Sequence, residues 1–463
     1  MQKVLNELID RDFDLLVADV QELVRIPSML DETTTGEGAP FGKTIRQALE
    51  LTLAKAADMG FKTKNVDGYA GYAELGNSGD QVGILAHLDV VPAIGEWDVA
   101  PFSGEIIDNK LYGRGSVDDK GPGIACLYAM KAIKESGLPF KNRARLIWGT
   151  DEETFARGIY YYLDREENPT YGFSPDAEFP IVHAEKGTIR FVYHLPVADS
   201  DILEIKAGTR LNVVPDSAYA KLNGVSLQTC TICAEKIKPF SNVKFTFSKE
   251  AKYLLIKAEG VASHACYPED GINAIQGLLM LLREIFPNKN TPIKESLHAL
   301  ANKLETETAG KSMGIYCEDE VSGSLTLNTA IISVDSDEGI IKFDIRYPVT
   351  RDGNLILSQL NELENEFGAK FELIQHKPPL YIEKERPFIK MLQKAYEECT
   401  GEKAECISIG GGTYCRYIKN TVSYGPVFPG QKELAHQANE FISLEDLRKI
   451  AKIYAQAIYN LIE

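Results

Sequence analysis

The sequence predicts an α/β protein whose first domain is interrupted by a second domain rich in strands. The length of 463 residues suggests about two or three domains. The first 185 residues alternate helical segments with short apolar segments, as α/β domains do. From about residue 187 to 380 strand-like pieces dominate and helices are fewer, and after about residue 385 the helix and strand alternation returns. We therefore expect residues 1–186 and 383–463 to form one domain and residues 187–382 to form an inserted one.

The expected elements follow from hydrophobic periodicity. Helical spacing of apolar residues runs through about 2–26 and again through LELTLAKAADMG. The run QVGILAHLDVV has the length and apolarity of a buried strand, a helix is expected from about Gly121, and ARLIWGT predicts a second buried strand. In the inserted domain, TIRFVYHLP, AKYLLIKAEGV and LTLNTAIISVD predict strands, and INAIQGLLMLLREIF is the clearest helix.

The composition limits the classes of partner. Lys and Arg total 50 against 67 Asp and Glu, which gives a formal net charge of −17. Because binding to phosphates depends on clustered cations, this charge argues against nucleic-acid and anionic-membrane partners. The N-terminal MQKVLNELIDRDFDLL lacks the features of a signal peptide, and no run approaches the ~18 apolar residues of a membrane span. We therefore expect a cytoplasmic protein.

The cysteines suit a reducing compartment. Eight are scattered singly, apart from Cys230 and Cys233, so a disulfide framework is not expected. The single CxxC pair has neither a second pair nor a nearby histidine, which favours ordinary packing over a structural zinc site.

Three common active-site motifs fail or are absent. GEGAPFGKT resembles a phosphate-binding loop, but Glu37 stands where that motif needs a glycine. GKSMG around Ser312 matches the nucleophile-elbow pattern, but it follows a polar helical stretch instead of a buried strand. There is no HExxH helix, which excludes a thermolysin-like site.

His87 and Asp89 stand at the end of the strand predicted from QVGILAHLDVV. Residues two apart on a strand face the same side, so both side chains can point into one site at the strand's C-terminal edge. A histidine with a carboxylate beside it fits a metal ligand, because a coordinating imidazole usually needs its other nitrogen held. A lone histidine at such a position would more often be structural.

Carboxylates cluster at two further element ends. Asp118 and Asp119 in GRGSVDDKGP precede the predicted helix, where they could instead cap it and favour its dipole. Asp151, Glu152 and Glu153 follow the strand ARLIWGT. Three consecutive carboxylates there are costly unless cations neutralise them, and a solvated acidic turn is the alternative.

Asp176 in SPDAEFP and His436 in ELAHQANE complete the candidate ligands. Together these segments give two histidines and several carboxylates, each at the end of an element. Divalent ions bind this mixture, and two metals that share one carboxylate make a hydrolytic site about 3.5–4 Å across. The combination is more specific than any of its members.

In their order and wording, the motifs are similar to those of the dinuclear zinc peptidase family that includes aminoacylase, carnosinase and glutamate carboxypeptidases. The resemblance covers essentially the whole chain and rests on HLDVVP, WDVAPFSG, GRGSVDDKG, GTDEE, PDAEFP, VASHACYPEDGINAI and AHQANE. Within the family, the long insertion and the wording of GRGSVDDKGP, GTDEE and PDAEFP most resemble the PepV-type dipeptidases. The fold implied is a zinc-peptidase catalytic domain with a large inserted α+β lid domain.

The resemblance implies two zinc ions per chain. Asp118 is expected to bridge them, with His87 and Asp176 completing the ligands of one ion and Glu153 and His436 those of the other. Mn²⁺ or Co²⁺ could replace zinc, because carboxylates are prominent ligands. The resemblance also implies a cis peptide bond between Asp118 and the residue that follows it.

The same resemblance implies catalytic and substrate-binding roles. Glu152 matches the general base and Asp89 the residue that orients the first histidine ligand. His264 matches the histidine that polarises the scissile carbonyl, and Arg346 the residue that binds the substrate's C-terminal carboxylate. Further substrate-pocket elements are implied at Asn212 and in the loop of Gly410, Gly411, Gly412 and Thr413.

The implied chemistry is peptide hydrolysis. A zinc-bridging water is acidified enough to attack near neutral pH, and Glu152 can accept its proton and pass it to the leaving amine. His264 and one zinc would stabilise the oxyanion, and such donors are worth ~2.7–4 kcal/mol each. Arg346 offers a planar fork suited to a carboxylate, and a surface ion pair is the alternative for it.

We therefore expect a metallo-dipeptidase for dipeptides with a free amino terminus, with β-alanyl-histidine and other Xaa-His dipeptides among the candidate substrates. The alternatives are an N-acyl amino acid deacylase or an aminotripeptidase of the same family. A non-catalytic relative that only binds metal or peptide is disfavoured, since neither Glu152 nor any ligand is lost. The enlarged lid implies a monomer in which His264 acts within its own chain, and a dimer is the alternative.

Overall fold

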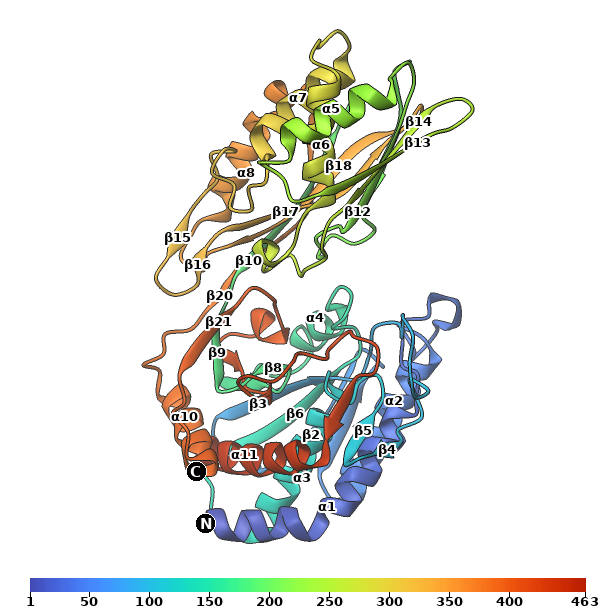
Figure 1. Ribbon diagram of the computed structural model, residues 1–463. Coiled ribbons are helices and arrows are strands. Elements are labelled where there is room, and N and C mark those ends of the chain that lie inside the picture. Colours follow the sequence, from blue (N-terminus) through green and yellow to red (C-terminus); the bar gives the residue numbers. More distant parts are fainter. The chain divides into compact units, whose positions relative to one another are not determined.

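The computed structural model describes residues 1–463, which form two compact units (Figure 1). The first unit contains both termini, and the second is inserted into it. The first unit comprises Met1–Ala184, Ile382–Ser408 and Gly412–Glu463, and the second comprises Glu185–Tyr381 and Ile409–Gly411.

A mixed sheet runs through the first unit. Its strands are β1 (Lys62–Val66), β2 (Ala70–Leu75), β3 (Gln81–His87), β6 (Arg143–Gly149), β7 (Tyr171–Ser174), β9 (Ile181–Glu185), β21 (Cys406–Ile409) and β22 (Thr421–Ser423). They lie in the order β1-β2-β6-β3-β7-β22-β9, and β21 also pairs with β9. The central strands β6, β3, β7 and β22 run parallel, whereas β1 and β2 join the edge antiparallel. Short strands at the margins are β4 (Ile106–Ile107), β5 (Lys110–Tyr112), β8 (Ala177–Glu178), β23 (Pro426–Val427) and β24 (Phe441–Ser443).

Helices cover both faces of this sheet. They are α1 (Gln2–Val24), α2 (Lys43–Asp58), α3 (Lys120–Ser136), α4 (Arg157–Leu163), α10 (Pro387–Thr400) and α11 (Leu444–Ile462). Ile84 and Leu146 share a large apolar core with α1, α3 and α11, whereas the next residues, Leu85 and Ile147, lie in a smaller core with α4. Successive strand residues point to opposite faces, so the two runs of apolar residues are buried on both sides.

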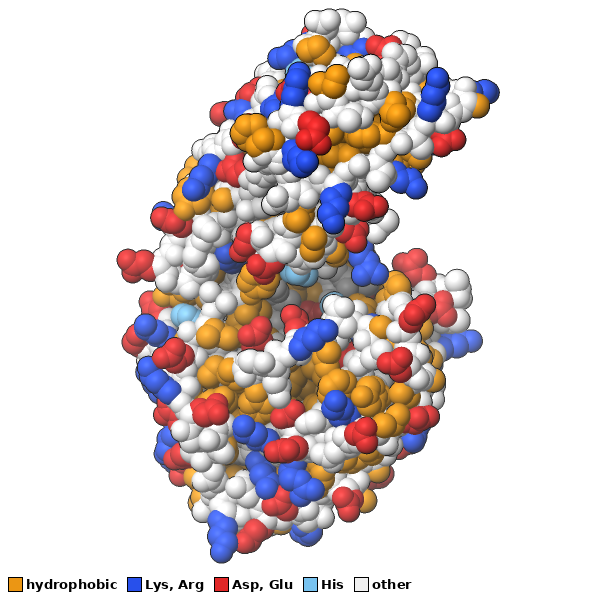
Figure 2. Space-filling view, in the orientation of Figure 1, with side chains coloured by type: hydrophobic (Ala, Val, Ile, Leu, Met, Phe, Trp, Pro, Cys, Tyr) orange, Lys and Arg blue, Asp and Glu red, His pale blue; other side chains and the backbone are white.

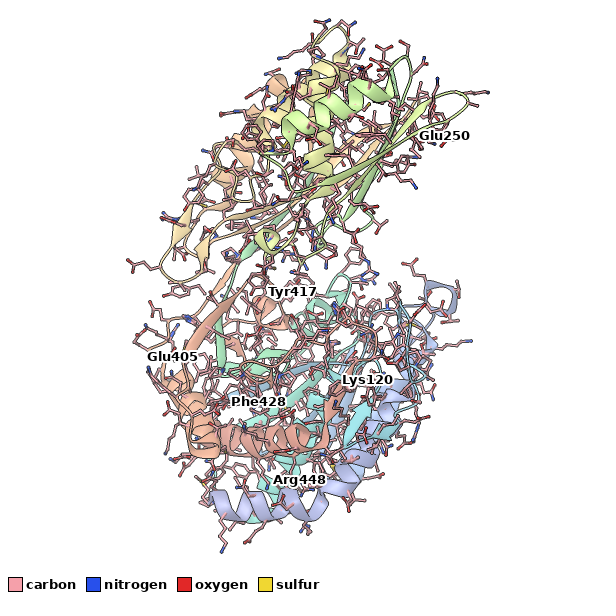
Figure 3. The ribbon with its side chains drawn as sticks, in the orientation of Figure 1. Lys120, Glu250, Glu405, Tyr417, Phe428 and Arg448 are labelled. Atoms are coloured by element: carbon pink, nitrogen blue, oxygen red, sulfur yellow. The ribbon has the colours of Figure 1, made fainter.

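The helices and strands expected in the first unit are present. The apolar run after Asp80 forms β3, all seven residues of which are buried. The helix expected from about Gly121 is α3, and it starts one residue earlier, at Lys120. The Lys120 side chain, labelled in Figure 3, is fully buried. It donates a 2.7 Å hydrogen bond to the carbonyl of Ile26.

An antiparallel sheet forms the second unit. Its strands are β10 (Gly187–His194), β11 (Ile202–Ala207), β12 (Ser217–Leu222), β13 (Lys244–Lys249), β14 (Leu254–Glu259), β17 (Thr326–Val334), β18 (Gly339–Tyr347) and β19 (Lys370–Lys377). They lie in the order β13-β14-β12-β11-β17-β18-β10-β19, and every pair is antiparallel. Shorter strands are β15 (Glu318–Asp319), β16 (Gly323–Ser324) and β20 (Leu380–Tyr381).

The second unit also contains helices, which are α5 (Leu227–Ile237), α6 (Ala274–Ile285), α7 (Pro292–Leu304), α8 (Gly353–Glu362) and α9 (Glu364–Phe367). Of these, α6 is the helix expected from INAIQGLLMLLREIF. Helix α7 is amphipathic and buries Ile293, Leu297 and Leu304 at helical spacing in the core that it shares with the sheet. Cys230 and Cys233 on α5 lie in the same core, as the packing interpretation predicts.

The predicted fold class is confirmed: an α/β unit carries an inserted α+β unit. Acidic and basic side chains are interspersed over the visible surface (Figure 2). None of the helices is both long and apolar enough to cross a membrane.

Candidate metal centre

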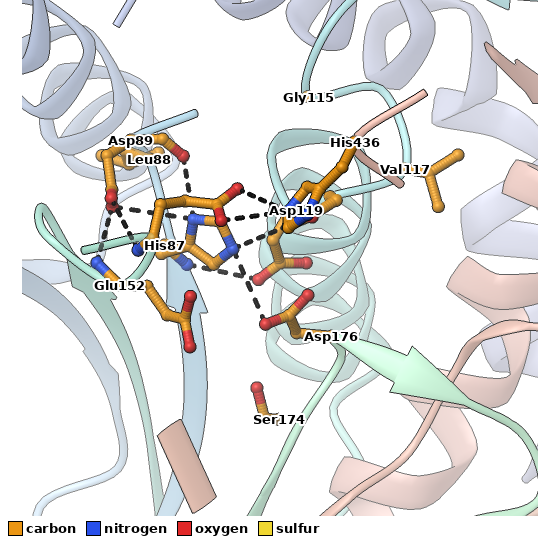
Figure 4. Close-up of polar contacts among 12 residues, drawn as sticks. His87, Leu88, Asp89, Gly115, Val117, Asp119, Glu152, Ser174, Asp176 and His436 are labelled. Carbon is orange, nitrogen blue, oxygen red and sulfur yellow. Dashed lines mark hydrogen bonds and ion pairs between the residues drawn. The ribbon is translucent and has the colours of Figure 1, made fainter. Parts of the chain in front are cut away.

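The candidate ligands meet where the central strands of the first unit end. His87 ends β3, and its register partner Gly149 ends β6. Strand β7 ends at Ser174, two residues before Asp176. The carboxyl ends of parallel strands share one edge of a sheet, so the segments that leave these strands come together. Asp118, just before α3, reaches the same edge and contacts His87. Figure 4 shows Asp176 and His436 beside His87.

The Asp118 carboxylate lies between two histidines. Its Oδ1 is 2.8 Å from Nε2 of His87, and its Oδ2 is 3.1 Å from Nε2 of His436. On one side Asp176 Oδ2 lies 3.6 Å from His87 Nε2, and on the other Glu153 Oε2 lies 3.0 Å from His436 Nε2. One carboxylate with an oxygen directed to each of two ligand groups is the arrangement that a bridged pair of ions requires.

Potential ligand atoms gather in two overlapping groups. His87, Glu152 and Asp176 form one group, and His87, Asp118 and Glu153 form the other, each within 4.8 Å. Imidazole and carboxylate ligands bind zinc at about 2.0–2.2 Å, so ligand atoms around one tetrahedral ion lie ~3.4 Å apart. The separations of 2.8 Å and 3.6 Å from His87 Nε2 to the carboxylates of Asp118 and Asp176 therefore suit a divalent ion.

The charges at this edge also fit cations. Burial raises the pKa of Asp176 to about 7, and the negative charge of Asp118 adds to the effect. Burial raises the pKa of Glu152 well above its usual range, and the carboxylates of Asp176 and Glu153 raise it further. Buried carboxylates so close together oppose one another's ionisation, and a divalent cation among them removes that conflict.

Asp89 holds two parts of the centre. The Nδ1 atom of His87 lies 2.9 Å from the backbone oxygen of Asp89 and 3.6 Å from its carboxylate. Nδ1 therefore donates to the carbonyl, and Nε2 faces the other ligands. The carboxylate itself accepts the backbone N–H groups of Glu152 at 3.1 Å and Glu153 at 3.0 Å. Asp89 thus fixes the turn that carries these two glutamates, a contact that its place beside His87 did not predict.

The structure contradicts two alternatives for the acidic clusters, namely capping of the helix by Asp118 and Asp119 and a solvated acidic turn at residues 151–153. Asp119 is the N-cap residue of α3, but its side chain makes no capping hydrogen bond and accepts the backbone N–H of His87 at 3.2 Å instead. The bond between Asp118 and Asp119 is cis, as the resemblance implies. Asp151 is 1% exposed and pairs with Arg157 at 2.7 Å, so this segment is not a solvated turn.

In the second unit, three of the candidate substrate-binding residues lie close together. The N–H of Ala265, next to His264, donates to the carbonyl of Asn212 at 2.9 Å. The carbonyl of Ala265 in turn accepts from the hydroxyl of Thr326, and Thr326 is the register partner of Arg346. His264 Nδ1 accepts the N–H of Cys266, two residues along, at 3.2 Å.

Arg346 is not part of a surface ion pair. Its side chain is buried and bonds the carboxylate of Asp344 at 2.6 Å and 3.2 Å and the carbonyl of Gly410 at 2.9 Å. A buried, fixed guanidinium is suited to anion recognition. Gly412 belongs to the first unit, as does Thr413, whose hydroxyl caps the short helix Tyr414–Tyr417.

Sequence reasoning gave no role to Arg114 and Glu440, which form a buried ion pair at 2.7 Å. Each lies four residues from a candidate ligand, in GRGSVDDKG and AHQANE respectively. The sequence did hold a signal for this pair. The two segments were expected to meet at the metal centre, and each contains one residue of opposite charge that could pair with the other.

Comparison with known proteins identifies the family. The model of Peptidase family M20/M25/M40 matches residues 83–460. The chain belongs to this family. Among curated members, "Putative dipeptidase YtjP" of Bacillus subtilis is 39% identical over 455 residues, which cover 96% of this chain and 97% of that protein.

Solved structures of the M20 fold agree with the architecture. Human carnosine dipeptidase 1 superposes with a TM-score of 0.62 at 17% identity, covering 100% of this chain and 98% of that one. The dipeptidase Dug1p of Saccharomyces cerevisiae gives a TM-score of 0.61 at 14% identity, covering 99% of this chain and 98% of that one. The protein is therefore an M20 peptidase with the fold of that family.

Proposed function

We propose that this M20 peptidase is a dinuclear zinc dipeptidase that hydrolyses dipeptides with a free amino terminus. The observation that carries the proposal is the position of Asp118, with one oxygen toward His87 and the other toward His436. Support for the substrate class comes from the relatives, since the 39% identical B. subtilis protein carries the name "Putative dipeptidase YtjP".

In this proposal five side chains hold the two ions. Asp118 would be shared by both ions, His87 and Asp176 would hold one, and Glu153 and His436 would hold the other. When bound, such ions act as Lewis acids that polarise a carbonyl and acidify water. Mn²⁺ or Co²⁺ can take these positions, since three of the five ligands are carboxylates.

Glu152 is proposed to move the proton. Its backbone N–H is held by Asp89 at 3.1 Å, so the side chain starts from a fixed point at the edge of the sheet. Burial and the neighbouring carboxylates raise its pKa, which makes it a better proton acceptor than an exposed glutamate. It takes a proton from the attacking water and delivers it to the nitrogen of the leaving amine.

The second unit is proposed to supply substrate-binding groups. His264 would donate a hydrogen bond to the oxygen on which charge develops. Arg346, held by Asp344, would pair with the carboxylate at the C-terminal end of a dipeptide. Recognition of that terminus restricts the enzyme to short substrates, because a longer peptide places its carboxylate farther from the bond to be cut.

A substrate comparison tests this proposal. Purified protein is assayed with a dipeptide, its N-acetylated form and a tripeptide, in the presence of Zn²⁺, Mn²⁺ or Co²⁺. We expect cleavage of the free dipeptide only. Faster cleavage of the acetylated form would assign a deacylase instead, and faster cleavage of the tripeptide an aminotripeptidase. Protein carrying Glu152→Gln, purified in parallel, controls for contaminating peptidases.

A further inference from the structure

We infer that Glu440 is a positioning residue for the metal centre: it keeps the segment that presents Asp118 in place against the segment that presents His436. The inference rests on the proposed metal-binding role of those two residues. Glu440 is in neither group of potential ligand atoms and is completely buried, at 0% exposure.

One oxygen of Glu440 organises the backbone around Asp118. Its Oε1 accepts the N–H groups of Gly115 at 3.0 Å, Val117 at 2.9 Å and Asp118 itself at 3.3 Å. Three backbone donors therefore converge on a single carboxylate oxygen, in the manner of an anion held in a nest of amides. Without this acceptor the three N–H groups would be buried without partners. The free-energy cost of those unpaired donors would favour a different backbone conformation for the segment.

The second oxygen joins Glu440 to the start of the same segment. Its Oε2 accepts Nη1 of Arg114 at 2.7 Å, and the guanidinium is 1% exposed. The backbone carbonyl of Glu440 also accepts the N–H of Gly113 at 2.9 Å. The segment from Gly113 to Asp118 thus wraps around one side chain that comes from 326 positions farther along the chain than Arg114.

The segment that carries His436 is also anchored next to Glu440, through Asn439. Asn439 exchanges two hydrogen bonds with Asp98, at 2.7 Å through its Oδ1 and at 3.0 Å through its Nδ2. His436 and Asn439 adopt left-handed backbone conformations, with φ of 63° and 61°. Such conformations are uncommon outside glycine, although Asn and His adopt them more often than most residues. The hydrogen bonds of Asn439 and the buried side chain of Glu440 therefore anchor the end of the turn that carries His436, whose own side chain is 47% exposed.

Two double variants separate positioning from electrostatics. Arg114→Met with Glu440→Gln removes both charges but keeps an oxygen for the three N–H groups. Arg114→Met with Glu440→Leu removes the same charges and the acceptor as well. Both leave the net charge of the centre unchanged, and neither leaves one buried charge unpaired, which is the costly case.

We expect the Leu variant to bind Zn²⁺ and Co²⁺ about 10–100-fold more weakly than wild type, the usual loss when an outer partner of a ligand is removed. The Gln variant should stay close to wild-type affinity. Affinity is measured by competition with a chromophoric chelator, and the visible absorption spectrum of the Co²⁺ form reports the ligand geometry. The Leu variant should change this spectrum, and the Gln variant should not.

A matched control uses a buried pair elsewhere in the same unit. Arg145 and Glu74 pair at 2.5 Å and are 5% and 8% exposed. Arg145→Met with Glu74→Leu should lower the thermal midpoint without a change in metal affinity. If the variant with Glu440→Leu does not fold, the single variant Glu440→Asp replaces it: Arg114 is kept as the partner of the charge, and the shorter side chain withdraws the acceptor from the three N–H groups.

The outcomes distinguish this inference from the proposed function. Unchanged affinity and an unchanged Co²⁺ spectrum in the folded Leu or Asp variant would overturn the positioning role alone. Equal losses in the Gln and Leu variants would overturn it too, because they would show that charge and not the acceptor matters. Wild-type protein that binds neither ion would overturn the proposed function together with the inference.

Discussion

His436 Nε2 lies 3.0 Å from Glu153 Oε2, although 283 positions separate the two residues in the chain. The contact joins the end of β6 to the loop before β24, which the second unit separates in sequence. The same nitrogen is 3.1 Å from Asp118 Oδ2. Three ligand-type side chains from three distant segments therefore meet at one point, which is what a metal position needs and what local packing does not require.

The first prediction is that activity depends on metal. Removal of metal with a chelator should abolish dipeptide hydrolysis, and Zn²⁺, Mn²⁺ or Co²⁺ should restore it. Elemental analysis should find up to two divalent ions per chain, because the ligand-type side chains fall into two overlapping groups. Full activity in protein shown by the same analysis to be free of metal would end the proposal.

The second prediction concerns Glu152. Glu152→Gln keeps the size of the side chain but removes the proton acceptor, so kcat should fall by at least ~10²–10⁴-fold. The metal content should stay the same, since the ligand role is assigned to the neighbouring Glu153. A variant that lost metal while Glu153→Gln kept it would exchange the roles of the two glutamates. The structure makes this control necessary, because Glu152 also lies among the potential ligand atoms around His87.

The third prediction is that one chain is sufficient for catalysis. His264→Ala and Glu152→Gln should each be inactive, and an equal mixture should stay inactive if His264 serves the metal centre of its own chain. The mixture is incubated long enough for subunits to exchange, and light scattering after size exclusion gives the mass of the active species. Recovery of activity in the mixture would show that the histidine is donated between subunits.

The spacing of apolar residues and the order of the motifs predicted the strands and the segments that carry the candidate site residues. The apolar runs that became β3 and β6 placed His87 and the glutamates of GTDEE at one edge, and the motif order pointed to Asp118 and His436. Contacts between distant segments had no such signal. The bond from Glu440 to the N–H of Asp118 spans 322 positions, and no periodicity encodes it.

A nearer contact was within reach of sequence reasoning. Asp344 and Arg346 are two apart on β18, so they share a face of the strand and could have been paired as a buried couple. Helix α7 also has apolar residues at helical spacing, but INAIQGLLMLLREIF was the only helix named for this part of the chain. In both cases the spacing of the residues in the sequence carried the information.

The last prediction concerns stability and pH. Asp12 on α1 bonds the guanidinium of Arg11 at 2.8 Å and 2.7 Å and also pairs with Lys131 on α3, which ties the two helices together. The hydrogen bond from Arg11 lowers the pKa of Asp12 to about 2, with Lys131 adding to the effect. The unfolded value is about 3.9. A carboxyl whose folded pKa lies below its unfolded value stabilises the fold above the unfolded pKa and loses that contribution as the pH falls toward the folded one.

Asp12→Asn should therefore reduce the free energy of unfolding by about 1–2 kcal/mol at pH 6, after discounting for solvent screening of the pair. The difference between variant and wild type should shrink by about half at pH 3, where the unfolded wild-type carboxyl is protonated. Denaturant unfolding of metal-free protein at both pH values, followed by circular dichroism, measures it. Asp14→Asn, at an exposed position on the same helix, is the control and should change little. A difference as large at pH 3 as at pH 6 would mean that Asp12 stabilises the fold through packing and not through its charge.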